Sequence, residues 1–233
     1  MIRAALFDIG DTLITSRDTE ETFRTILLEK GIDISPEEIG RAHAAATEKF
    51  IGERKDMRPP GARDFNEVYA AWNEAVIREL GIKKKGLGKY INQRWFEVVG
   101  LQAYDDAAPV LNRLSAMGLR LGIVTNGYRE EVDEILSIIG DPLKTGMFSV
   151  IVGRDTAGAS KPDPRPFLHA AGTLGLRPDE VIFVGDRYDK DYIGAQAVGM
   201  KPVLILRGRK LPPGVPEDIT TIQTLDELTD LVR

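Results

Sequence analysis

The sequence predicts an α/β protein: a Rossmann-like parallel sheet flanked by helices, with an all-helical domain inserted into it. Short apolar runs, typical of strands buried on both faces, alternate with amphipathic stretches over the second half of the chain. Strands that alternate with helices in this way form parallel sheets through right-handed crossovers. A long stretch near the start of the chain has helical periodicity instead and contains no such apolar run.

The apolar runs place the strands of the predicted sheet. The first strand is expected at Ala4–Phe7, where four apolar residues end at Asp8. Later runs predict strands at Leu119–Val124, Met147–Val152, Val181–Val184 and Pro202–Leu206, with a weaker edge strand at Ile219–Ile222. Amphipathic stretches between and after these runs predict helices at Glu130–Ile139, Arg165–Leu174, Asp191–Val198 and Leu225–Val232.

The inserted domain is expected to consist of four helices. They are predicted at Glu20–Lys30, Pro36–Phe50, Phe65–Leu80 and Leu87–Val99, separated by Gly31, the Pro59-Pro60-Gly61 turn and Gly81. Ser35 and Asp64 each stand where a helix N-cap is expected. The predicted boundaries are therefore residues 1–14 and 103–233 for the sheet domain and residues 15–102 for the helical insertion.

The composition excludes several classes of protein. With no cysteine, the chain has no disulfide framework, no thiolate zinc site and no cysteine nucleophile. Its net charge of −5 argues against a nucleic-acid or membrane partner, and no apolar run approaches the ~18 residues that span a bilayer. Met1–Phe7 enters the first strand with no signal peptide. We expect a cytoplasmic globular protein, as a monomer or small homo-oligomer.

Polar residues follow the predicted strands at the points where the strands end. They are Asp8 after the first strand, Thr125-Asn126-Gly127 after the second, Lys161 between the third and fourth, and Asp186 and Asp191 after the fourth. Open parallel sheets bind ligands beyond the carboxyl ends of their strands. Carboxylate oxygens suit Mg²⁺, whereas hydroxyl, amide and ammonium donors suit phosphate oxygens. The pattern therefore predicts a Mg²⁺-assisted phosphate site.

In this order, these residues resemble the motifs of the haloacid dehalogenase superfamily, whose members are mostly Mg²⁺-dependent phosphatases acting through an aspartyl-phosphate. The most specific motif is Gly185-Asp186 followed by Asp191, after an apolar strand. The resemblance covers essentially the whole chain and places the helical insertion where the family has its C1-type cap. It implies a phosphatase acting on a small phosphorylated metabolite.

The resemblance also implies a role for each residue of the site. Asp8 corresponds to the nucleophile, and Lys161 to the cation that neutralises developing charge. Phosphoryl oxygens would be held by Lys161, Thr125 and the backbone amides near Asn126 and Gly127. The implied Mg²⁺ ligands are Asp8, the backbone carbonyl of Gly10, Asp186, and Asp191, the last acting through water or by positioning Lys161.

The sequence departs from the family pattern at Gly10. The family usually has there a second aspartate, which protonates the leaving group and later activates water. Positioned proton transfer is worth ~10²–10⁴ in rate, so its loss matters. Three explanations are open: Asp11 substitutes, a cap side chain supplies the proton, or the leaving group needs none. We favour the last two, because adjacent residues at a strand end point to opposite sides.

Two other functions compete with the phosphatase. Carbon–halogen hydrolysis also occurs in this superfamily, but it needs no Mg²⁺, so Asp186 and Asp191 together favour phosphate. A weakly active homologue that only binds phosphate or metal would be consistent with Gly10. The remaining candidates are weaker: substrate contact is expected at Ser16 and Arg17 more than at Arg54, Lys55 and Arg58, whereas His43 and His169 are expected to be packing or surface residues.

Overall fold

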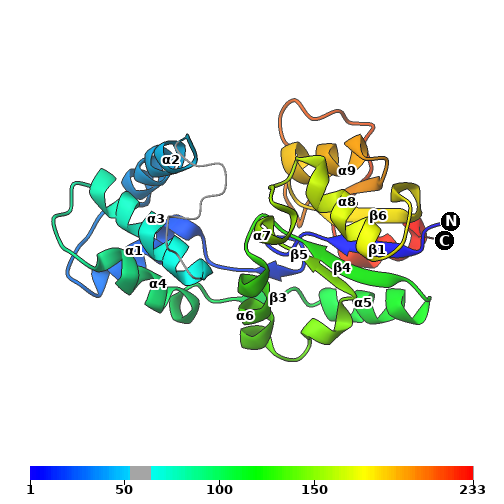
Figure 1. Cartoon of the computed structure of the whole chain (residues 1–233), viewed down its shortest axis with the longest axis horizontal. Helices are drawn as coiled ribbons and strands as arrows, with labels where there is room; N and C mark the ends of the chain where they lie inside the picture. The colour runs from blue at the N-terminus through cyan, green and yellow to red at the C-terminus, as the bar shows by residue number, and fades with distance from the viewer. Residues whose placement is uncertain (53–63, 233) are drawn as a thin grey trace. The chain divides into compact units, whose positions relative to one another are not determined.

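The computed structural model describes residues 1–52 and 64–232 of the chain, with the side chains of residues 50–52 left out. The chain divides into two compact units. Met1–Thr15 and Gln102–Arg233 form one, here called the sheet unit, and Ser16–Leu101 form the other, the helical unit (Figure 1). The boundaries predicted from the sequence each differ from these by one residue. The Pro59-Pro60-Gly61 turn and the neighbouring basic residues Arg54, Lys55 and Arg58 lie outside the described residues.

The sheet unit is built on six parallel strands. Their order across the sheet is β5 (Val150–Val152), β4 (Arg120–Val124), β1 (Ala4–Phe7), β6 (Val181–Gly185), β7 (Lys201–Ile205) and β8 (Thr221–Ile222). The chain runs from β1 through β4 to the edge strand β5 and then crosses to β6, on the other side of β1, to build the other half. This is the doubly wound order, whose ligands bind at the carboxyl ends of the central strands. The predicted Rossmann-like α/β fold is confirmed.

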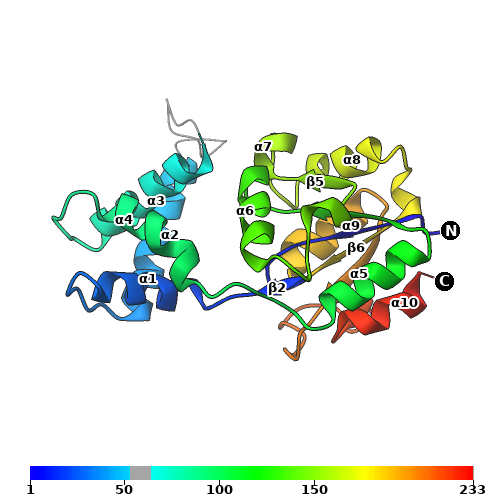
Figure 2. The ribbon, with the colours of Figure 1, turned by 90° about the horizontal axis from the view of Figure 1, so that it is seen from below.

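Helices cover both faces of this sheet (Figures 1 and 2). The main ones are α5 (Ala107–Ala116) and α6 (Arg129–Ile139) on one face and α8 (Pro164–Thr173) and α9 (Ile193–Ala197) on the other, as right-handed crossovers require. The short helices α7 (Arg154–Ala157) and α10 (Leu228–Leu231) complete the unit. None of the described helices combines the length and the apolar character that crossing a bilayer requires.

Close packing at the centre of the sheet explains why β1 is apolar throughout. All four of its residues are buried, and Leu6 lies in one apolar cluster with Phe167 of α8 and Phe183 of β6. A Cβ atom on Gly122 of β4 would come within 2.6 Å of Leu6 and 2.5 Å of Val150. Glycine at this position therefore lets three neighbouring strands pack without a collision.

Several elements differ from the sequence-based prediction. Helix α5 was not predicted, nor was the small antiparallel sheet formed by β2 (Ile14–Thr15) and β3 (Gln102–Ala103). The strand expected from Met147 begins only at Val150, because Thr145–Met147 form a 3₁₀-helix. The helix expected from Asp191 is preceded by the π-helical turn η3 (Tyr188–Tyr192) and starts at Ile193.

The helical unit contains α1 (Thr19–Leu28), α2 (Pro36–Gly52), α3 (Phe65–Glu79) and α4 (Leu87–Val98). Both predicted N-caps are present: Glu38 donates its amide to Ser35 Oγ at 3.3 Å, and Glu67 donates to Asp64 Oδ1 at 3.0 Å. The unit is held by one apolar cluster that draws residues from all four helices. This apolar core of its own explains why the segment forms a separate compact unit.

Candidate active site

Four of the predicted site residues gather at the carboxyl end of the sheet. Asp8 follows β1, Asp186 and Asp191 follow β6, and Lys161 comes from the loop between α7 and α8. The Nζ atom of Lys161 lies 2.7 Å from Asp8 Oδ1 and 2.7 Å from Asp191 Oδ1. Each of the three aspartates places a carboxylate oxygen within 4.8 Å of the other two. The site is therefore a cluster of carboxylates arranged around one ammonium group.

Lys161 is held in place by a residue from another strand end. The side chain of Asn126, which follows β4, accepts a hydrogen bond from Lys161 N at 2.7 Å and donates one to Lys161 O at 3.1 Å. This pair of bonds fixes the backbone from which the ammonium projects. The sequence predicts a phosphate contact from the backbone near Asn126, and does not predict this use of its side chain.

The side chain of Asp191 packs directly against Gly185, and this contact explains why a glycine precedes Asp186. A Cβ atom on Gly185 would come within 2.4 Å of the Asp191 carboxyl group, so only glycine leaves room for that side chain. The π-helical turn brings Asp191 back onto the end of β6, where its Oδ2 accepts a hydrogen bond from Arg187 N at 3.0 Å. Asp191 is buried and ion-paired directly with Lys161. Of the two roles expected for it, positioning Lys161 is the one its contacts favour.

Asp186 has a cationic partner that the sequence reasoning missed. Its Oδ2 accepts a hydrogen bond from Arg209 Nη2 at 3.1 Å. Arg209 lies on the loop after β7, the strand next to β6 in the sheet. The signal that could have found it is its position: it follows the carboxyl end of a strand, as Asp8 and Asp186 do.

Burial and crowding of charge shift the pKa values of these groups. Burial, reinforced by the negative charges of Asp191 and Asp186 and opposed by Lys161, raises the pKa of Asp8 to about 7. Burial and the neighbouring Asp191 also raise the pKa of Asp186, against the opposing effect of Arg209. Burial tends to lower the pKa of Lys161, but Asp8 and Asp191 outweigh it and raise that pKa, so the ammonium stays protonated.

The donor set of this cluster fits Mg²⁺. All the available ligand atoms are oxygens, and their carboxylates carry more negative charge than Lys161 alone offsets. Hard oxygen ligands from one or two carboxylates are what Mg²⁺ requires in sites that also bind phosphate. Burial and the crowding of the carboxylates raise the pKa of Asp8, and a divalent cation bound beside it would favour its ionised form.

Thr125 and Gly127 lie at the end of β4, where the sequence predicts a phosphate-binding loop. Thr125 is buried, and its Oγ1 accepts a hydrogen bond from Gly127 N at 3.1 Å, which leaves its hydroxyl proton able to donate. A Cβ atom on Gly127 would come within 2.5 Å of Glu131 Oε2, the atom that accepts Tyr128 N at the start of α6. Gly127 therefore permits a tight turn from β4 into the helix.

Gly10 and Asp11 follow the nucleophile candidate and occupy very different surroundings. Among the described atoms of the sheet unit other than its chain neighbours, none lies within 4 Å of a Cβ placed on Gly10. Asp11 has the left-handed backbone angle φ 49°. Its exposed carboxylate has Oδ2 3.9 Å from Arg209 Nη1 and is outside the three-aspartate cluster. The residue that could replace the missing acid is thus directed at an arginine.

The remaining candidates lie outside this cluster. His43 is buried in the helical unit, where its ring stacks on Trp72 at a centroid distance of 4.8 Å, so it is a packing residue as expected. His169 is exposed on α8. Ser16 and Arg17 are exposed residues of the helical unit, and their predicted substrate contact stays a prediction.

Comparisons of the sequence and of the structure with known proteins point to the same family. Residues 2–199 match the model of the haloacid dehalogenase-like hydrolases. The chain is 32% identical over 246 positions to a glyceraldehyde 3-phosphate phosphatase of Methanopyrus kandleri, covering 100% of this chain and 98% of that protein. A HAD phosphatase from Thermococcus onnurineus superimposes with a TM-score of 0.63 at 28% identity, covering 99% and 98% of the two chains. An L-2-haloacid dehalogenase from Xanthobacter autotrophicus reaches 0.71, covering 100% and 99%, but is 21% identical, so it shows the fold alone.

Proposed function

The chain belongs to the haloacid dehalogenase-like hydrolases, and we propose that it is a Mg²⁺-dependent phosphatase acting on a small phosphate monoester through an aspartyl-phosphate on Asp8. The observation that carries this proposal is the sharing of one buried ammonium, Lys161, between Asp8 and Asp191 beside Asp186. A phosphatase named for glyceraldehyde 3-phosphate among the relatives supports a small phosphorylated metabolite as substrate.

Asp8, Asp186 and the backbone carbonyl of Gly10 would hold Mg²⁺, with Asp191 supporting the site through Lys161. The bound ion would offset the negative charge of the carboxylates and of the phosphate, which otherwise repel each other. Gly10 retains the carbonyl oxygen that this assignment needs.

In the first step, a carboxylate oxygen of Asp8 attacks phosphorus while the bond from phosphorus to the leaving oxygen breaks. Lys161, within 2.7 Å of Asp8 Oδ1, orients the carboxylate and donates to the phosphoryl oxygens as charge develops on them. The hydroxyl of Thr125 and the amides near Gly127 donate to the remaining phosphoryl oxygens. In the second step, water attacks phosphorus and the bond from phosphorus to Asp8 breaks. Both protons of the water leave on the released phosphate, and the Asp8 carboxylate is restored.

The leaving oxygen needs a proton in the first step, and Gly10 cannot supply it. Asp11 lies beside Arg209 and outside the carboxylate cluster, which argues against its acting as the acid. We therefore propose that the substrate has a leaving group that is stable as an anion. A weakly active homologue is the corresponding alternative.

Carbon–halogen hydrolysis is the alternative reaction, because a dehalogenase shares the fold. The presence of Asp186 in the carboxylate cluster favours phosphate, since the superfamily's dehalogenases act without a metal. Hydrolysis of p-nitrophenyl phosphate with Mg²⁺ and with EDTA, alongside halide release from a 2-haloacid, separates the two reactions. Metal-independent halide release without phosphatase activity would contradict the proposal.

The covalent mechanism is tested by Asp8→Asn, with Asp189→Asn as a matched control. Asp189 is an exposed aspartate of the same sheet edge, paired with Arg187 and not with Lys161. We expect Asp8→Asn to lower kcat by about 10³ or more, and Asp189→Asn to stay within about twofold. Trapping of beryllium fluoride on the wild-type protein and not on Asp8→Asn would support the aspartyl-phosphate. An active Asp8→Asn protein would refute it.

A further inference from the structure

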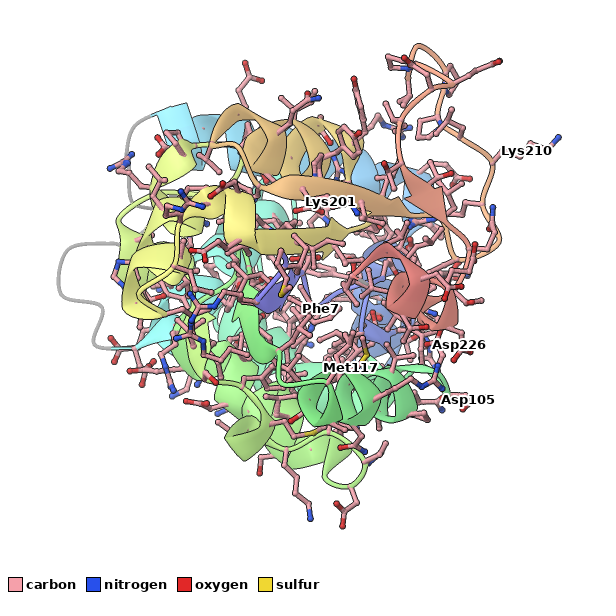
Figure 3. All side chains as sticks on the ribbon, turned by 90° about the vertical axis from the view of Figure 1, so that its right-hand side faces the viewer. Phe7, Asp105, Met117, Lys201, Lys210 and Asp226 are labelled. Carbon is pink, nitrogen blue, oxygen red and sulfur yellow. The ribbon has the colours of Figure 1, made fainter. Side chains whose placement is uncertain are left out.

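Arg209 is placed on the carboxylate that the proposed function assigns to the metal. Its Nη2 donates to Asp186 Oδ2 at 3.1 Å, and Asp186 has only 7% of its side chain exposed. Its Nε donates to Leu206 O at 3.1 Å, which fixes the stem of the side chain close to the end of β7. Figure 3 shows the neighbouring Lys210 projecting away from the protein on the same loop. Arg209 instead returns to the site.

A guanidinium at this position competes with a metal ion for Asp186. Both are cations, and the repulsion between them grows as the separation falls. Asp186 cannot bind a divalent cation at full strength while Oδ2 remains bonded to Arg209. Binding of a divalent cation to Asp186 must therefore weaken or break the contact with Arg209.

A second partner for Arg209 lies next to the first. Asp11 Oδ2 is 3.9 Å from Arg209 Nη1, beyond hydrogen-bond distance but close enough for a small side-chain movement to complete the pair. Asp11 is exposed, and Arg209 has 48% of its side chain exposed, so both side chains have room to move. Asp11 also lies in the loop that directly follows Asp8.

We propose that Arg209 is an exchangeable counter-ion: it neutralises Asp186 in the metal-free protein and transfers to Asp11 when Asp186 binds a divalent cation. Arg209 is in this sense a positioning residue that sets metal affinity, and the inference rests on the proposed function only in taking Asp186 as a metal ligand. It also gives Asp11 a role other than that of the missing acid.

The test is Mn²⁺ binding by the full chain, followed as free Mn²⁺ by electron paramagnetic resonance, in Arg209→Gln and in the control Arg187→Gln. Arg187 is also a half-exposed arginine at this edge, but its guanidinium pairs with Asp189. We expect Arg209→Gln to bind Mn²⁺ about three- to tenfold more tightly and Arg187→Gln to change the affinity by less than about twofold. Equal effects would show that only the lost charge matters and would overturn the proposal.

A second comparison tests the transfer to Asp11. Asp11→Asn is expected to weaken Mn²⁺ binding about two- to fivefold in the wild-type background, because Arg209 then loses its alternative partner. In the Arg209→Gln background it is expected to have a clearly smaller effect. The same effect in both backgrounds would refute the exchange. Should Arg209→Gln fail to fold, Arg209→Lys replaces it, with a smaller increase in affinity expected.

Asp186→Asn distinguishes failure of this inference from failure of the proposed function. If Asp186→Asn leaves Mn²⁺ binding unchanged, the metal assignment itself is wrong. If Asp186→Asn abolishes binding and Arg209→Gln does not tighten it, only the counter-ion role is wrong.

Discussion

Replacing Gly10 by aspartate restores an acid at the position where the family usually has one, and the structure permits the substitution. No described, non-neighbouring atom of the sheet unit lies within 4 Å of the new Cβ, and the backbone of Gly10 is outside the left-handed region. The stability cost of the new side chain itself is therefore expected to stay within about 0.5 kcal/mol. Any change in rate then reports on proton transfer and not on folding.

The expected size of the gain depends on the leaving group. For an alkyl phosphate, whose alkoxide is a strong base, a positioned acid contributes about 10² or more in kcat/KM. For p-nitrophenyl phosphate or an acyl phosphate, whose leaving group is stable as an anion, the gain should stay below about tenfold. The assay is phosphate release from glycerol phosphate, p-nitrophenyl phosphate and acetyl phosphate by wild type and Gly10→Asp.

Gly10→Asn is the matched control, since it has the size of aspartate and no acidic proton. It should leave all three rates close to those of the wild type. Equal acceleration of all substrates by Gly10→Asp, or acceleration by Gly10→Asn, would refute the view that Gly10 marks a missing acid. A pH profile that gains an acidic limb only in Gly10→Asp would support it further.

Two other predictions concern the charge balance of the site. Lys161→Met leaves Asp8 and Asp191 without their shared cation. At pH 8 the free energy of unfolding, measured with denaturant, should fall by about 3 kcal/mol or more, and kcat should fall by about 10² or more. An unchanged free energy of unfolding would contradict the pairing. In EDTA, the Asp8 pKa of about 7 lies above its ordinary 3.8, so the folded protein binds the extra proton between these values. The Asp8 contribution to stability is therefore fully present below pH 3.8, falls progressively as the pH rises, and is lost above about pH 7. Unfolding measured at pH 5 and pH 8 should show this loss in wild type and much less of it in Asp8→Asn.

The fold, and which residues gather at the site, could be predicted because both follow from simple periodic patterns in the sequence. A strand buried on both faces must be apolar, so β1, β4 and β6 are visible as short runs. Parallel strands end at one edge, so polar residues that follow such runs must lie near one another. Asp8, Asp186 and Asp191 meet for this reason, although up to 183 residues separate them in the chain.

Most of the parts that were missed lack such a pattern. Helix α5 is the exception, because Val110, Leu111 and Leu114 are buried at helical spacing and the pattern was overlooked. Strands β2 and β3 have two residues each, too few to show a period. The bonds from Asn126 to the backbone of Lys161, and from Arg209 to Asp186, depend on the paths of loops and not on spacing.

Metal affinity, metal-free stability and pH dependence are three consequences of one imbalance of charge. Three buried or half-buried carboxylates share two cations, Lys161 and Arg209, and burial together with the repulsion between the carboxylates opposes folding and raises the pKa of Asp8. A cation that binds only the folded protein raises the free energy of unfolding, and the increase grows with the affinity of the cation for the site. Variants that relieve the repulsion in the metal-free protein, such as Asp8→Asn, must therefore also weaken metal binding. If Asp8→Asn made the metal-free protein more stable and left its metal affinity unchanged, the crowded carboxylates would not be the source of the metal-binding energy.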